Sequence, residues 1–251
     1  MTTGKIIMMV SVAALTAAVP LGLMGYLHHK KGARWFPFLT GAVFFPLFAM
    51  GLERVFHSLV LGSPLGGAIS GNIWLYALYG GLAAGIFEEA GRLAAFRLVL
   101  KDRREPVTAL SYGLGHGGME AFLLVGLTMI ANLSLGLAHA AGTLPPEAAE
   151  MAETLAATPT VMFFWAGFER MPAIILHVSN SVLVFASVWT GRRWLFPAAI
   201  LTHAAVNFIA VTSASALPVA ATELLVLACS LLTALAAWRI YRKLAQNVEN
   251  A

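Results

Sequence analysis

Charged residues are scarce in this sequence of 251 residues: they make up 11% of the chain, whereas 59% of it is hydrophobic. Soluble domains are roughly 25% charged and about 45–50% apolar. No polar segment is long enough for a separate soluble domain, so we expect a single membrane domain over residues 1–251. The composition predicts an all-α, polytopic bundle of transmembrane helices in contact with the lipid bilayer.

Further absences narrow the classes of function. The one cysteine, Cys229, lies in the last apolar run and excludes an intramolecular disulfide. No serine stands in a recognisable nucleophile motif, so covalent catalysis is disfavoured. The basic residues lie at the ends of apolar runs, so the formal net charge of +4 does not indicate nucleic-acid binding. No internal repeat is evident, whereas many transporters are built from repeats.

Seven apolar runs are long enough to cross a bilayer, which takes about 20 residues. They cover residues 6–27, 35–61, 72–100, 107–138, 160–190, 194–213 and 217–239. The first run exceeds the length of a signal-peptide core and ends at two histidines and two lysines instead of a cleavage site of small residues. We therefore expect it to be retained as the first of seven membrane spans.

Connections that contain lysine and arginine alternate strictly with connections that contain neither. Eleven of them follow the first, third, fifth and seventh runs: Lys30, Lys31, Arg34, Lys101, Arg103, Arg104, Arg192, Arg193, Arg239, Arg242 and Lys243. The connections 62–71, 139–159 and 213–217 contain none, and only Lys5 lies on their side. The positive-inside rule predicts an outer N-terminus and a cytoplasmic C-terminus. We expect an integral, multi-pass protein of a bacterial cytoplasmic membrane.

Two adjacent carboxylates and a guanidinium lie within the third run: Glu88, Glu89 and Arg92. At membrane depth a charged side chain costs at least ~2.5–3.5 kcal/mol on insertion scales. On a helix Arg92 shares a face with Glu88 at a spacing of four residues and reaches Glu89 at a spacing of three. Charged groups remain at this depth when they are paired, hydrated or used, so this stretch is the centre of a candidate site.

Three later runs carry polar side chains at helical spacing. They are His116 and Glu120 on the fourth run, His177, Asn180 and Ser181 on the fifth, and His203 and Asn207 on the sixth. A single buried histidine is more often a hydrogen-bonded core residue than a ligand. At 1.5 Å per residue, however, the glutamates and the three histidines all lie about 15–20 Å from the cytoplasmic edge. We therefore predict one site, within residues 72–213 and in the cytoplasmic half of the membrane.

Other buried charges lie nearer the outer half. They are Glu53, Arg54 and His57 on the second run and Glu169 and Arg170 on the fifth. Each group contains its own counter-charge, so we interpret both as structural ion pairs, with substrate positioning by Arg170 as the alternative.

A carboxylate beside histidines in a protected cavity can activate water for the hydrolysis of an amide: a general base takes the proton, and a second group stabilises the oxyanion. Alternatively, His116, His177 and His203, which come from three helices at similar depth, can bind a zinc ion that keeps a position open for water. A proton-coupled transporter would also place carboxylates and histidines at this depth. A non-catalytic membrane binding or immunity protein is the third alternative.

The sequence resembles the CAAX-endopeptidase and bacteriocin-processing superfamily of intramembrane proteases. Its EExxR motif is matched by Glu88-Glu89-Ala90-Gly91-Arg92, its HxxxN motif by His203-Ala204-Ala205-Val206-Asn207, and its intermediate histidine by His116. The closer resemblance is to the YhfC-type branch of membrane peptidases, through His116-Gly117-Gly118-Met119-Glu120 and Glu169-Arg170…His177. The superfamily has phenylalanine where this chain has Tyr112, a departure that keeps the aromatic character.

The resemblance implies an intramembrane endopeptidase, of metallo- or glutamic type, that acts on a membrane-embedded or lipidated peptide or protein. It implies that Glu88 or Glu89 is the general base, that Arg92 holds the carboxylate pair and that His116 orients the water. It also implies that His203 and Asn207 stabilise the oxyanion, or that His203 binds a metal. Glu120, His177 and Asn180 are then expected to surround these residues and to contact the substrate or the site.

Overall fold

The computed structural model describes residues 1–249, which contain helices and no strand. Six of these helices are long and apolar enough to cross a membrane: Thr3–Lys31, Trp35–Leu61, Val107–Ala140, Thr160–Trp189, Leu195–Ala214 and Val219–Asn247. They coincide with six of the seven predicted runs, within four residues at each end, except that the last helix continues eight residues beyond the predicted end at residue 239. The remaining run also forms a helix, α5 (Ile73–Ala94), continued by the π-helical segment η2 (Ala95–Val99). Its charged side chains lower its mean hydropathy, so length and composition alone do not mark it as a span.

Several of the long helices are built from consecutive segments. Trp35–Leu61 comprises α2 (Trp35–Phe45), π-helical η1 (Pro46–Glu53) and α3 (Arg54–Leu61). Val107–Ala140 comprises α6 (Val107–Ala121), π-helical η3 (Phe122–Gly126) and α7 (Leu127–Ala140). Thr160–Trp189 comprises α9 (Thr160–Phe168) and α10 (Arg170–Trp189). The others are α1 (Thr3–Lys31), α4 (Leu65–Ser70), 3₁₀-helical η4 (Pro146–Ala148), α8 (Ala149–Ala157), α11 (Leu195–Ala214) and α12 (Val219–Glu249). The segment η1 contains the buried Glu53, η2 begins three residues after the buried Arg92, and η3 begins two residues after the partly buried Glu120. Such distortions are frequent at functional sites.

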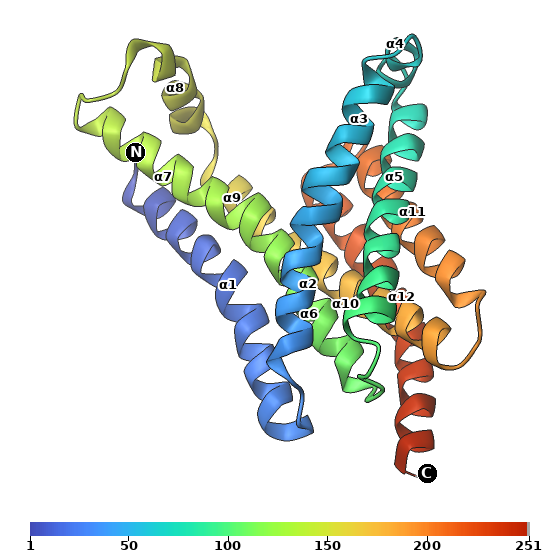
Figure 1. Cartoon of the computed structure of the whole chain (residues 1–251). Coiled ribbons are helices and arrows are strands. Elements are labelled where there is room, and N and C mark those ends of the chain that lie inside the picture. Colours follow the sequence, from blue (N-terminus) through green and yellow to red (C-terminus); the bar gives the residue numbers. More distant parts are fainter. Residues whose placement is uncertain (250–251) are drawn as a thin grey trace.

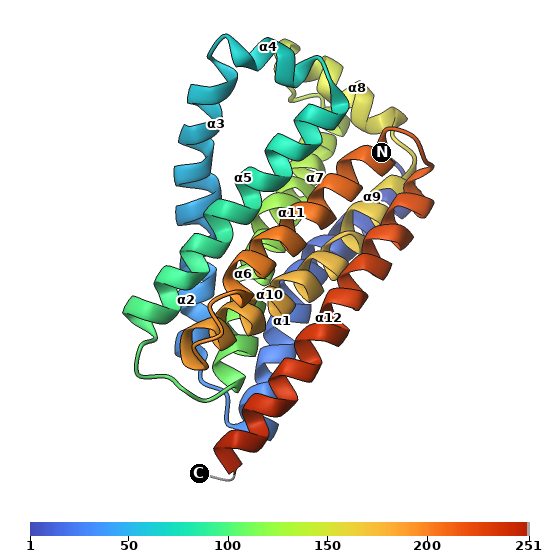
Figure 2. The ribbon, with the colours of Figure 1, turned by 90° about the vertical axis from the view of Figure 1, so that its right-hand side faces the viewer.

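The helices pack together at one end of the molecule and diverge into two arms at the other (Figure 1). One arm contains α7 and α8 with the start of α1, and the other contains α3, α4 and the start of α5. In the shared part, α6 packs against both α2 and α10, α5 packs against α11, and α10 packs against α12. The view turned by 90° shows α12 running beside α10 and α11 along the side of the bundle (Figure 2).

Two glycines bring helices of the shared part close together. A Cβ atom on Gly85 of α5 would lie 2.7 Å from the carbonyl oxygen of Ile200 on α11, and one on Gly115 of α6 would overlap the backbone of Phe38 on α2. Because real Cβ atoms do not approach so closely, only glycine permits these crossings. Gly85 lies one turn before Glu89, and Ile200 lies one turn before His203. The close crossing therefore places the carboxylates of α5 beside the histidine of α11.

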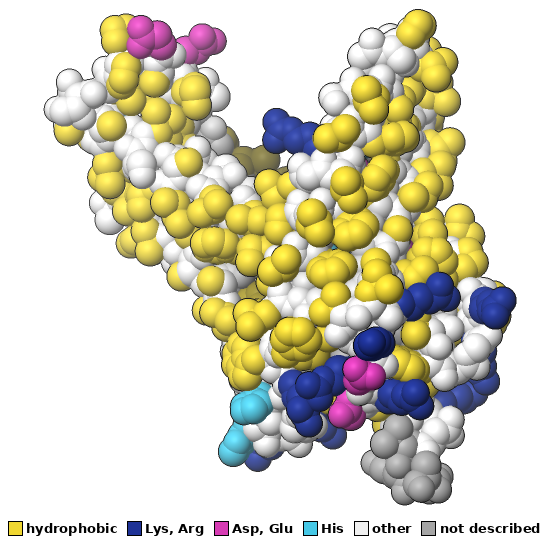
Figure 3. Space-filling model, viewed as in Figure 1, with side chains coloured by type: hydrophobic (Ala, Val, Ile, Leu, Met, Phe, Trp, Pro, Cys, Tyr) yellow, Lys and Arg dark blue, Asp and Glu magenta, His cyan; other side chains and the backbone are white. Residues whose placement is uncertain are grey.

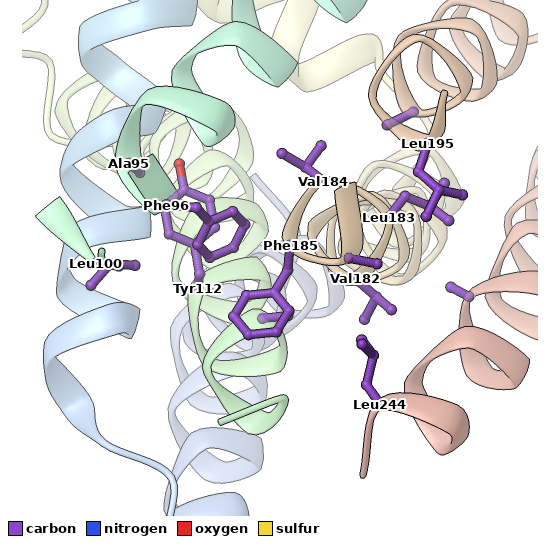
Figure 4. Packing of buried hydrophobic residues seen from close by; sticks show 14 residues of the cluster. Ala95, Phe96, Leu100, Tyr112, Val182, Leu183, Val184, Phe185, Leu195 and Leu244 are labelled. Carbon is purple, nitrogen blue, oxygen red and sulfur yellow. The ribbon is translucent and has the colours of Figure 1, made fainter. Parts of the chain in front are cut away.

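An apolar cluster lies at the end of the shared part that carries the basic residues (Figure 4). Phe96 packs against Tyr112 at a tilt and against Phe185 edge to face, with ring centroids 5.0 and 5.4 Å apart, and all three residues are at most 1% exposed. Phe96 follows Arg92 by one turn of helix, and Tyr112 precedes His116 by one turn. The cluster therefore seals the polar layer on that side.

The charged side chains on the visible surface lie mostly at its two ends (Figure 3). Most of the visible lysine and arginine side chains gather at the lower end of this view, together with some acidic ones, and further acidic side chains lie at the tip of the arm that carries α8. Between these ends the visible surface is largely hydrophobic, and a hollow separates the two arms. This pattern matches an apolar belt between two polar ends, as a membrane protein requires.

Candidate active site at the meeting of four helices

Four helices bring the predicted polar side chains into one buried layer. The contributors are Glu88, Glu89 and Arg92 from α5, His116 from α6, His177 and Asn180 from α10, and His203 from α11, and none is more than 6% exposed. The rise per residue of a helix, counted from the basic connections, was enough to predict that these side chains lie in one layer. The individual contacts depend on how each helix is rotated about its axis.

Glu88 lies at the centre of the three histidines. Its Oε2 accepts a hydrogen bond from His116 Nε2 at 2.8 Å and lies 3.8 Å from His177 Nδ1. Its Oε1 lies 3.8 Å from His203 Nε2. The other nitrogen of the first histidine, His116 Nδ1, is buried and has no hydrogen-bond partner among the described residues. The two oxygens of Glu88 thus face different partners, which allows them different tasks.

Glu89 is fully buried and is held on every side. Its Oε2 accepts a hydrogen bond from Arg92, and its Oε1 accepts bonds from His203 Nδ1 at 2.9 Å and Asn180 Nδ2 at 3.2 Å. The Oδ1 of Asn180 in turn accepts a bond from Thr202 at 2.9 Å. Because carboxylates only accept, His203 must carry its proton on Nδ1, which turns Nε2 toward Glu88. Glu89 therefore orients the site but lies away from the cavity described below.

A second line of polar contacts runs from Arg92 through His177 and Glu120 to Arg170. Arg92 Nη2 donates to His177 Nδ1 at 3.2 Å, and the other nitrogen of His177 contacts Glu120. Glu120 also accepts a hydrogen bond from Arg170 at 2.9 Å, and Arg170 pairs with Glu169 as well. The predicted ion pair of Glu169 and Arg170 is thus confirmed. It is also connected to the site, which the sequence interpretation did not anticipate.

The charges on the second run are arranged differently from the prediction. Glu53 contacts His57 at 3.1 Å, and His57 also bonds the hydroxyl of Tyr79 at 2.7 Å. Arg54 is exposed and makes no ion pair within the described part of the chain. A single helical step of 100° separates neighbouring residues, so Glu53 faces inward while Arg54 points out.

Glu88, His116 and His177 are close enough to hold a metal ion, since each offers a ligand atom within 4.8 Å of the others. Ligands of a tetrahedral zinc at ~2.0–2.1 Å lie roughly 3.3 Å from one another. The observed separations of 2.8 and 3.8 Å between Glu88 and the two histidines bracket that value. The donor set therefore fits a zinc ion, although Arg92 would have to release His177 Nδ1. The predicted third histidine, His203, is instead bonded to Glu89.

A cavity of about 350 Å³ extends from these residues between α10, α11 and α12. Its walls include Glu88, His177, His203 and Asn207. Asn207 is half-buried and has no side-chain hydrogen bond among the described residues, so its amide is available to a ligand. The cavity reaches Ala214 and Thr222, at the turn between α11 and α12, on the side away from the apolar cluster of Figure 4.

Sequence reasoning missed one wall of this cavity. It is formed by Thr222, Glu223, Val226 and Ser230 of α12. The available signal was an acidic residue within an apolar run, seven residues before a serine, which places both on one face of a helix. The last predicted run was interpreted only as a membrane span, so these residues were not assigned to the site.

The family described as YhfC intramembrane metalloprotease matches residues 15–226. The chain belongs to the YhfC family. The match includes all of the buried polar layer and reaches Glu223 on α12. The uncharacterized membrane protein YhfC of Bacillus subtilis (strain 168) is 34% identical to this chain over 209 residues, which are 79% of this chain and 81% of that protein. No solved structure matches the chain.

Proposed function

We propose that this YhfC-family chain is an intramembrane endopeptidase that hydrolyses a peptide bond of a membrane-embedded or lipidated peptide or protein. The observation that carries the proposal is the position of Glu88. Its carboxylate lines the cavity and lies within 3.8 Å of three histidines from three other helices. The family description as a metalloprotease supports the same class of reaction. We also propose membership of the wider CAAX-endopeptidase and bacteriocin-processing superfamily, because its two motifs meet at Glu89 and His203.

The residues that would hold a metal are Glu88, His116 and His177, and we propose that the metal is zinc. When bound, zinc supplies a Lewis acid that activates water and polarises the substrate carbonyl. Its positive charge would also offset the carboxylates of Glu88 and Glu89, since Arg92 is the only fully buried cation in the layer.

The side chains themselves can carry the proton and hold the substrate. Glu88 Oε1, on the side of His203, is placed to accept a proton from a water in the cavity. His203 lies between Glu88 and Glu89, where it can carry a proton on both nitrogens and donate from Nε2 to the developing oxyanion. Asn207, one turn further along α11, supplies a second donor. Arg92 and Asn180 act only by holding Glu89 and, through it, His203.

Purification without chelators tests this proposal. The protein should contain one zinc per chain by elemental analysis, and its proteoliposomes should cleave a single-span peptide, as detected by mass spectrometry. Chelation should remove both properties, zinc should restore both, and His116→Ala should lower the metal content. An active protein with little metal would show a glutamic-type hydrolysis in which Glu88 acts alone. Proton-coupled flux without any cleavage would instead show a transporter.

We propose that residues 1–251 form one membrane domain with seven spans. These are the six long apolar helices and, third in chain order, α5 with its continuation η2. The N-terminus would lie outside and the C-terminus in the cytoplasm of a bacterial cytoplasmic membrane. The strict alternation of basic connections supports this orientation, as does the gathering of lysine and arginine at one end of Figure 3.

The orientation predicts the outcome of single-cysteine labelling. In a Cys229→Ala background, Glu150→Cys should react with an impermeant maleimide added from outside, and Arg103→Cys should react only after the membrane is opened. Both positions lie in connections between the proposed spans, so the substitutions should leave the fold intact. Labelling of position 150 only from the cytoplasmic side would reverse the orientation.

A further inference from the structure

The wall that α12 contributes to the cavity contains polar atoms that nothing in the described chain satisfies. Thr222 Oγ1, Glu223 Oε2 and Ser230 Oγ are buried and have no hydrogen-bond partner. These side chains are at most 8% exposed, and all three line the cavity that contains Glu88. A buried polar group without a partner is costly, more so within a membrane, where water is scarce. Three such groups on one helix face indicate that the cavity receives a polar ligand.

The charges around the cavity indicate the sign of that ligand. Four carboxylates line it, those of Glu88, Glu120, Glu169 and Glu223, against the single guanidinium of Arg170. Arg170 is already paired with Glu120 and Glu169, and Glu88 contacts the histidines. Glu223 alone makes no ion pair among the described residues. Its missing partner is therefore a hydrogen-bond donor that carries positive charge.

The position of Glu223 relates this partner to the reaction. Leu176 and Val206, which precede His177 and Asn207 in sequence, pack against Val226 of α12. Ser230 lies one turn from Val226 toward the buried layer, and Glu223 lies about one turn from it in the opposite direction. Ser230 and Glu223 are therefore about 10 Å apart along the helix. An extended peptide covers this distance with about three residues.

We propose that Glu223 binds an ammonium group of the substrate, about three residues along the peptide from the part that Ser230 contacts, while Thr222 and Ser230 hydrogen-bond to the peptide. The proposal rests on the proposed endopeptidase function. The ammonium group comes either from a lysine side chain or from the amino terminus of the peptide. Glu223 thus sets the specificity of the cavity and takes no part in bond cleavage.

Binding to an inactive protein tests this inference without any cleavage. The probes are three fluorescent apolar peptides of equal length: one acetylated with a central lysine, one acetylated with glutamine in its place, and one with that glutamine and a free amino terminus. The protein is full-length Glu88→Gln in nanodiscs of phosphatidylcholine, whose zero net charge does not attract lysine, and the affinities come from fluorescence anisotropy.

The lysine peptide, the free-amine peptide or both should bind about tenfold more tightly than the acetylated glutamine peptide. Which of them does so identifies the source of the ammonium. Adding Glu223→Gln should remove the preference, whereas the matched control Glu150→Gln, which removes an exposed carboxylate of α8, should keep it. Equal binding of all three peptides, or a preference that survives Glu223→Gln, would overturn the inference.

A second measurement requires no change at Glu223, in case the variant is unstable. Butylammonium should displace the lysine peptide from the Glu88→Gln protein, and butanol at the same concentration should not. Equal displacement by both compounds would contradict an ammonium site. These binding experiments do not measure hydrolysis, so they are independent of the endopeptidase proposal: a wild-type protein that cleaves nothing in proteoliposomes would refute that proposal and leave the ammonium site standing.

Discussion

Glu88→Gln should lower the rate of peptide hydrolysis by about 10³-fold or more while the protein remains folded. Glutamine has nearly the same shape and can still bond His116, so the packing around the site should survive. It cannot accept the proton of a water molecule, and its neutral amide is a poor metal ligand. Initial rates in proteoliposomes, measured together with the thermal unfolding temperature, check both parts of this expectation.

Glu53→Gln is a matched control for this experiment. Glu53 is also a buried glutamate, with 7% of its surface exposed, and like Glu88 it contacts a histidine, in this case His57 of its own span. It makes no hydrogen bond or ion pair with the residues of the polar layer, so hydrolysis should stay within a few-fold of the wild-type rate. A Glu88→Gln protein that cleaves as fast as wild type would remove Glu88 from the reaction and end the proposal built on it.

Removing Glu89 should have its largest effect on stability. Glu89→Leu should lower the free energy of unfolding by about 3–5 kcal/mol, because it leaves the guanidinium of Arg92 buried without its counter-charge. Both side chains are fully buried and in direct contact. Hydrolysis should be lost as well, since His203 and Asn180 lose the carboxylate that orients them.

A double variant separates the charge from the packing. Glu89→Leu combined with Arg92→Met removes both charges and should recover much of the lost stability, because no unpaired charge remains. Glu150→Leu, at an exposed position of α8, should change the stability little. Reversible unfolding in mixed detergent micelles is measured for five proteins: the wild type, Glu89→Leu, Arg92→Met, the double variant and Glu150→Leu. If the losses of stability caused by Glu89→Leu and by Arg92→Met simply add in the double variant, the two residues are not energetically coupled.

The sequence by itself determined how far along their helices the predicted polar groups lie. Helix rise is constant, so the distance of Glu88, His116 or His203 from its nearest basic turn follows from counting residues. Apolar length and the alternation of basic connections determined the helices themselves. Six of them are long and apolar enough to span a membrane, and α5 completes the seven helical runs.

Only the tertiary structure distinguished Glu88 from Glu89. Neighbouring residues on a helix point about 100° apart, and which of them faces a cavity depends on how the helix is rotated against its neighbours. That rotation is set by contacts such as Gly85 against Ile200, which counting along one chain segment does not reveal. The same reason explains why His203 bonds Glu89 instead of completing the predicted cluster of three histidines.

The contribution of α12 was also decided by packing. An apolar run with one glutamate predicts a membrane span, and nothing local shows what its polar face meets. In the folded chain α12 lies beside α10, so Glu223 and Ser230 line the same cavity as Glu88 and His177. The position of a residue along its helix axis follows from the order of residues alone. Which helices lie beside that residue depends on how all the helices pack together.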